Sequence, residues 1–124
     1  MIPTKQDVAE FIAASFRSVW DLELLCYLRL TPGLDQPAAR MVADLRASEL
    51  VVANSLAGLL ATGLIVVEAD GSARYAPANQ LLDQLSQSAG ELYKQRPDAV
   101  RRMIVTAASP GISAFADAFR LRKE

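Results

Sequence analysis

Few side chains in this chain could perform catalysis. The 124 residues include no histidine, which removes the commonest general base and most metal sites. Two close pairs of acidic residues, Asp21 with Glu23 and Glu68 with Asp70, lie at an expected helix start and around an expected turn, where solvated surface is the simpler role. The glycines are scattered and form no phosphate-binding loop. We therefore expect no enzymatic activity, no metal site and no cofactor.

Cys26 is the single cysteine, so the chain forms no internal disulfide and suits a reducing compartment. A reactive or ligand-sensing thiol is one interpretation of this residue. The other, which we favour, is a small apolar side chain in the core, because Cys26 lies within the apolar run LELLCYL. Arg29, three residues away, is the basic residue closest to it in the sequence.

The charge distribution does not favour nucleic acid in a simple way. The net charge is −1, and residues 1–79 carry six basic groups against nine acidic ones, whereas residues 80–124 carry seven against five. Lys94, Arg96, Arg101 and Arg102 could form a basic patch for phosphates or an acidic partner. A solvated helix face is the interpretation that we favour for them.

The elements that must position any binding residue are clearest in residues 36–75. Pro37 suits the start of a helix, and Ser48 is a ready N-cap for the next one, whose apolar residues follow at spacings of three and four. We expect that helix to end at Gly63 and a strand to follow at residues 64–67. Asp70 and Gly71 are typical of a hairpin turn, after which we expect a return strand at residues 73–76. The pattern predicts two helices followed by a two-stranded hairpin.

Helical spacing also marks the flanking segments. Thr4 and Asp7 predict the capped start of a first helix, and a second one runs through the stripe Trp20, Leu24, Leu25 and Leu28. About three short helices follow Asn79, broken at Pro97 and at residues 110–111. We predict a mainly α fold with a small β-hairpin in a single domain, residues 1–124, with its core at 18–78 and flanking helices at 4–16 and 79–121.

A membrane span is the less favoured interpretation of residues 50–67. They hold no charged residue and just reach the length of a spanning helix. However, they include Asn54 and Ser55, and the pattern changes from helical spacing to a β-branched run at Gly63. With no signal segment at the start of the chain, we expect a cytoplasmic protein without membrane contact.

Residues 20–75 resemble the winged helix-turn-helix transcriptional regulators of the MarR and ArsR type. The matching segments are WDLELLCYL (20–28), AARMVADLRAS (38–48), LAGLLATGLIVV (56–67) and DGSARY (70–75). The resemblance implies a mainly helical fold with a β-wing, a bacterial homodimer and DNA as the partner. It assigns no family to the C-terminal part of the chain.

The resemblance implies that the helix after Ser48 lies in the major groove and that the hairpin approaches the phosphates. It places Ser48, Asn54, Ser55 and Arg74 nearest DNA, with Asn54 able to pair with adenine. Arg40 and Arg46, on the preceding helix, would meet phosphates. The expected function is thus a DNA-binding transcriptional regulator.

The same helix also supports a second interpretation, because it carries no lysine or arginine. Groove-reading helices usually carry such residues, since neutralising phosphates supplies most of the affinity. Leu50, Ala53 and Ala57 instead form an apolar outer stripe, which is more typical of protein contacts. The alternative is a winged-helix protein-interaction module that does not bind DNA specifically. A helix simply covered by the tail or by a dimer partner is a third interpretation.

Two pairs of phenylalanines are the expected dimer contacts. Phe115 and Phe119 lie one helical turn apart near the C-terminus and predict packing on another helix. The first helix, with Phe11 and Phe16, is their expected complement, contributed by a second subunit.

Overall fold

The computed structural model describes residues 2–108, which form six helices and one two-stranded antiparallel sheet. The elements are α1 (Lys5–Ser15), α2 (Val19–Arg29), α3 (Ala38–Leu45), α4 (Glu49–Ala61), β1 (Ile65–Val67), β2 (Ala73–Tyr75), α5 (Gln80–Gln95) and α6 (Pro97–Ala108). The prediction of a mainly helical chain with a small hairpin is confirmed. The last predicted helix, with Phe115 and Phe119, lies outside the described residues.

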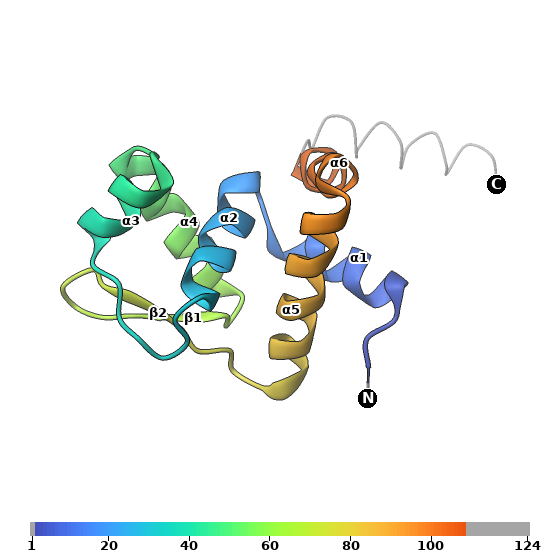
Figure 1. Cartoon of the computed structure of the whole chain (residues 1–124), viewed down its shortest axis with the longest axis horizontal. Coiled ribbons are helices and arrows are strands. Elements are labelled where there is room, and N and C mark those ends of the chain that lie inside the picture. The colour runs from blue at the N-terminus through green and yellow to red at the C-terminus, as the bar shows by residue number, and fades with distance from the viewer. Residues whose placement is uncertain (1, 109–124) are drawn as a thin grey trace.

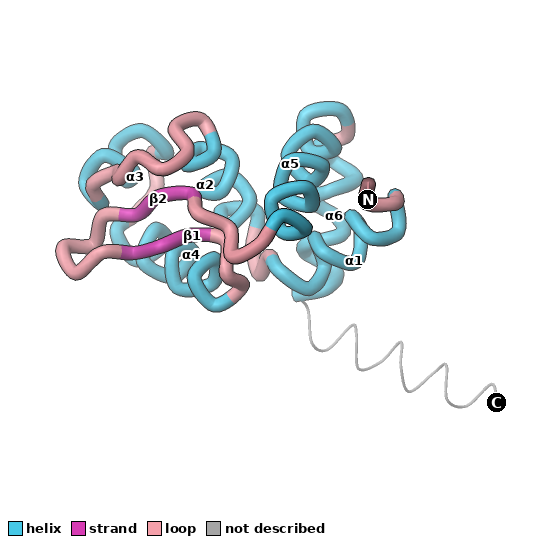
Figure 2. The backbone as a smooth tube through the Cα atoms, turned by 90° about the horizontal axis from the view of Figure 1, so that it is seen from below, coloured by secondary structure: helices cyan, strands magenta, loops and turns pink. Residues whose placement is uncertain are grey.

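Helix α2 lies between two groups of elements (Figure 1). On one side of it are α3, α4 and the hairpin, and on the other are α1, α5 and α6. The view from below shows the same division, with β1 and β2 next to α3 and α4 and far from α1 (Figure 2). The hairpin and α4 therefore share one end of the molecule.

Local sequence signals explain where the helices begin. Thr4 and Asp7 form a reciprocal capping box at α1, and the side chains of Ser48 and Asn79 accept hydrogen bonds from the backbone of α4 and α5. Proline begins α6, where a missing N–H costs nothing. These predicted caps of α1, α4 and α5 are confirmed.

The hairpin begins and turns at glycines with positive φ. Gly63 has φ of +76° directly after α4, and Gly71 has φ of +89° in the turn, conformations that side chains with a Cβ rarely adopt. Val66 pairs with Arg74 at the centre of the hairpin. Gln36, just before α3, adds an antiparallel bridge to Ala73, so a third extended segment covers the β2 edge.

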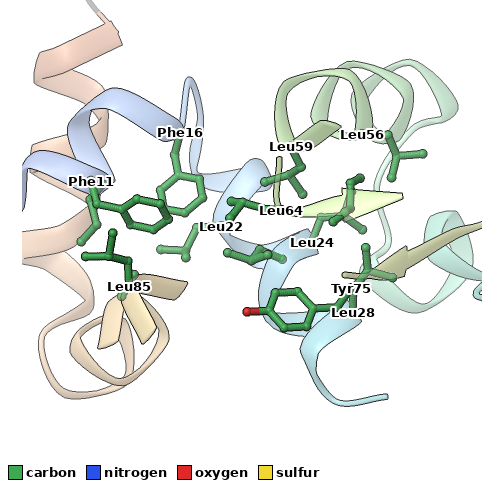
Figure 3. Close-up of a cluster of buried hydrophobic side chains, with 14 of the residues drawn as sticks. Phe11, Phe16, Leu22, Leu24, Leu28, Leu56, Leu59, Leu64, Tyr75 and Leu85 are labelled. Carbon is green, nitrogen blue, oxygen red and sulfur yellow. The ribbon is translucent and has the colours of Figure 1, made fainter. Parts of the chain in front are cut away.

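One contiguous cluster of buried side chains includes residues from all six helices and both strands. Figure 3 shows Phe11 and Phe16 facing Leu22 and Leu85 on one side of α2, with Leu56, Leu59 and Leu64 on the other side. The core therefore continues through α2 from one group of elements to the other, which holds α4 in a defined orientation.

Residues 50–67 are divided between α4 and β1 by the turn at Gly63. Among the residues described, no helix has both the length and the apolar character needed to cross a bilayer.

Candidate interaction surface around α4

The α3–α4 turn and a cap fix the position of α4. Arg46 ends α3 with φ of +53°, an uncommon conformation for arginine, and the N–H of Ala47 donates to the carbonyl of Val42. The hydroxyl of Ser48 then accepts from the N–H of Val51 at 3.1 Å and starts α4. The turn between the two helices is thus short, and Ser48 accepts hydrogen bonds from the N–H groups of Val51 and Val52 at the start of α4.

The inner face of α4 packs into the core. Its buried residues follow helical spacing and comprise Val52, Ser55, Leu56, Gly58 and Leu59. At Gly58 the helix approaches α2 closely, because an added Cβ would lie 3.3 Å from Oδ2 of Asp21. That carboxylate accepts a 2.9 Å hydrogen bond from the N–H of Arg17, which fixes the turn that leads into α2.

The outer face of α4 is also apolar. Leu50 is 69% exposed and Leu60 is 50% exposed, with Ala53 and Ala57 exposed between them. Glu49 is the only charged residue of the helix. A helix that is apolar all round is normally buried on every side, and this one is not. The outer face of α4 is therefore a candidate binding surface.

A groove of about 620 Å³ runs along one side of this face, between α3, α4 and the hairpin. We call it the α3–α4 groove. Its lining residues are Ala38, Ala39, Val42, Glu49, Val52, Ala53, Leu56, Ala57, Leu60, Val67 and Gly71. All but one of these are apolar, and Glu49 is the exception.

A second groove, the α2–α4 groove, runs along the other side of α4 and is more polar. It brings Arg17 and Trp20 beside Asn54 and Ala57. The prediction that Trp20 belongs to a buried stripe is wrong, because it lies in the first turn of α2 and is 39% exposed. Sequence reasoning missed Arg17 and Trp20 as neighbours of Asn54, since only the packing of α2 on α4 brings them together.

The basic residue of the hairpin is occupied by two carboxylates. One guanidinium nitrogen of Arg74, Nη1, bonds to Asp35 at 3.1 Å and also to Glu68. These hydrogen bonds, that to Glu68 first, raise the pKa of Arg74. At the hairpin tip, the hydrogen bond from the N–H of Ser72 lowers the pKa of Asp70, which keeps it negatively charged. The hairpin surface therefore presents the carboxylate of Asp70, whereas its one cation, Arg74, is already paired with Asp35 and Glu68.

The remaining predicted DNA-contacting residues lie on different parts of this surface. Arg40 on α3 and Arg46 at its end are exposed, and neither forms an ion pair with another residue of the described part. Asn54 is exposed on the α2–α4 side of α4. The hydroxyl of Ser48 serves as the N-cap of α4.

Ser55 does not reach the surface, so its expected outward position on α4 is wrong. Its exposed fraction is 3%. It lies three residues after Val52 and four before Leu59, both buried, and this spacing places all three on the inner face. The periodicity alone could have excluded Ser55.

The expected dimer contacts on α1 are also misplaced. Phe11 and Phe16 are 8% and 2% exposed, and their rings meet edge to face with centroids 5.6 Å apart. They belong to the protomer's own core, as Figure 3 shows, and cannot offer their rings to a second subunit. Ala9 and Ala13 of α1 instead line a surface furrow together with residues of α6.

Cys26 lies away from α4, between α2 and α5. Burial is the main cause that raises the pKa of its thiol, and the nearby Glu23 carboxylate raises it further. Together these two effects outweigh Arg29 and Lys94, which lower the pKa. These shifts favour the unreactive thiol form. Within residues 2–108, no cluster of three or more cysteine or acidic side chains could hold a metal ion.

Comparison with known proteins identifies no relative of this chain. No protein-family model, no curated protein and no solved structure matches the chain significantly. The surface around α4 is therefore the feature of the chain that bears on its function.

Proposed function

We propose that residues 18–78 form a winged helix-turn-helix module that binds a protein partner through the outer face of α4. The order α2, α3, α4, β1, β2, with a short turn between α3 and α4, supports the winged-helix assignment. In this assignment, the hairpin is the wing and α4 is the helix that would otherwise read DNA.

The observation that carries the proposal is the apolar outer face of α4. Eight large apolar side chains are exposed in the described residues, and three of them, Leu50, Leu60 and Trp20, lie on or beside α4. Such side chains lose contact with water when a protein covers them, which favours binding by about 25 cal/mol for each Å² of apolar surface. Phosphates would gain nothing from them.

The charges of the module point the same way. Residues 18–78 hold four arginines and seven acidic residues, a net charge of −3. Arg74, the cation nearest the expected minor-groove contact, is already bound by Asp35 and Glu68. The two carboxylates neutralise Arg74 and would repel a phosphate there, so the affinity of the module for DNA is expected to be low.

Sequence-specific DNA binding is the second candidate, because Arg17, Arg40 and Arg46 form no ion pair with another described residue. Arg17 lies beside Asn54 in the α2–α4 groove, and Arg40 and Arg46 are exposed on the α3 side. Together they could contact phosphates on both sides of α4. In either case we expect a homodimer, whose contacts involve surfaces other than Phe11 and Phe16.

Site-specific photocrosslinking in the host cell tests the leading proposal. A photoreactive residue replaces Ala57, which lines both grooves, and the matched control replaces Ala43, an exposed α3 residue that lines neither. We expect a discrete protein adduct at Ala57 that is absent at Ala43. Crosslinking to DNA alone, or the same adducts from both positions, would overturn the proposal.

A further inference from the structure

The α3–α4 groove is long enough to bind one short helix. Its α4 wall is formed by residues spaced three and four apart from Glu49 to Leu60. At about 1.5 Å per residue, this wall is about 16 Å long, close to three turns of a partner helix. This wall includes Ala53 and Ala57, whose small side chains leave room for larger ones from a partner.

An extended peptide is a poorer occupant. Adding a strand to the sheet requires a free strand edge with several unpaired backbone groups. The β2 edge is already bridged by Gln36, and β1 spans only Ile65–Val67. The apolar α3–α4 groove is therefore a better binding site than the short strand edge.

The charged side chain that lines the groove is acidic. It is Glu49, and Gly71, which also lines the groove, brings its neighbour Asp70 at the hairpin turn beside it. Asp70 is exposed and forms its hydrogen bond with Ser72 rather than with a cation. Basic side chains of an occupant could therefore meet two carboxylates, those of Glu49 and Asp70, that form no ion pair with another described residue.

We propose that the α3–α4 groove binds an amphipathic, basic helix of a protein partner. Apolar side chains of that helix at positions i, i+4 and i+7 enter the groove over Ala53 and Ala57. Its lysines or arginines lie near Glu49 and Asp70. This inference rests on the proposed protein-binding function and specifies the chemistry of the partner.

Two designed peptides of about 18 residues, long enough to form helices, test this inference. They share leucines at i, i+4 and i+7 and differ only in carrying lysine or glutamate on the polar face. Binding to the full chain is followed by fluorescence anisotropy and by backbone amide NMR shifts at low salt. We expect the lysine peptide to bind at least roughly tenfold more tightly, with salt reducing the difference.

Variants locate the site and its charge. Ala53→Gln places a larger neutral side chain in the groove and should weaken binding of the lysine peptide several-fold, whereas Ala43→Gln should not. Glu49→Gln should reduce the preference for lysine, and Glu91→Gln on α5 is its matched control. Circular dichroism verifies folding, and Ala57→Gln replaces Ala53→Gln if the latter does not fold.

Equal affinity for the two peptides, no binding of either, or shifts confined to β1 or to the α2–α4 groove would each overturn the inference. None of these outcomes affects the crosslink expected at Ala57. Failure of the inference is therefore distinguishable from failure of the proposed function.

Discussion

Helices α4 and α5 are both exposed on one side, yet their outer faces differ. The exposed side of α5 carries mostly polar residues, such as Gln80, Gln87 and Glu91, and one exposed leucine, Leu81. The outer side of α4 carries Leu50 and Leu60 instead. A helix with two apolar faces needs two partners, and the described chain supplies only the inner one. The difference supports the proposal that the outer face of α4 contacts a partner, whereas the exposed side of α5 is mostly solvated.

The largest expected effect separates the two faces of α4 at adjacent residues. Leu59 is fully buried and Leu60 is half exposed. Leu59→Ala should lower the free energy of unfolding by about 2–5 kcal/mol through lost burial and a cavity. Leu60→Ala should change it by less than about 0.5 kcal/mol, as at other surface positions. Urea denaturation measures both, and similar losses would show that the outer face is part of the protomer's core.

The N-caps of the two helices should contribute about equally to stability. Ser48 caps α4 and Asn79 caps α5, each accepting from the backbone of the first turn. Replacing either by alanine should cost about 1 kcal/mol in the free energy of unfolding. Thermal or urea unfolding provides the value. A far larger cost at Ser48 would mean that the hydroxyl has a second role at the α3–α4 turn.

The hairpin arginine offers a smaller and sharper test of the surface. Because Arg74 is held by Asp35 and Glu68, Arg74→Gln should leave the salt dependence of any residual DNA binding unchanged. A phosphate-contacting arginine would instead reduce the slope of log K against log salt concentration by about 1. Anisotropy titrations at several salt concentrations distinguish these results. A reduced slope would restore Arg74 to the DNA interface.

The smallest effect is expected at Cys26, which belongs to the α2–α5 region and not to the α4 surface. Its raised thiol pKa predicts slow alkylation by iodoacetamide at neutral pH, with the rate rising at a higher pH than for a free thiol. The thiolate is the reactive form, so the rate follows its fraction. Occupation of the α3–α4 groove by the lysine peptide should leave this rate unchanged. A changed rate would show that the two regions are coupled.

Most of the secondary structure was predictable because local physics determines it. Ser48, Asn79, Gly63 and Gly71 each act within a few residues of their own position, and all four occur where the pattern placed them. The buried and exposed sides were harder to predict. Trp20 has the spacing of a core residue but lies in the first helical turn, where packing leaves it exposed.

The site depended on contacts that are distant in sequence. Arg74 looked available until the structure placed Asp35, 39 residues away, against it. Phe11 and Phe16 looked like dimer contacts because the sequence does not show which helix face meets α5 and α6. The absence of cations on α4 and its outer stripe of Leu50, Ala53 and Ala57, by contrast, were visible in the sequence, and that apolar outer face carries the proposed function.

Anisotropy of a fluorescent generic duplex at low salt tests the central claim most directly. Even non-specific DNA-binding winged helices bind under these conditions, with dissociation constants of about 10⁻⁴–10⁻⁶ M already at physiological salt. We predict no saturable binding by the full chain at protein concentrations up to about 10⁻⁴ M. Saturable binding that weakens steeply with salt and is lost in an Arg40→Gln and Arg46→Gln double variant would contradict the account.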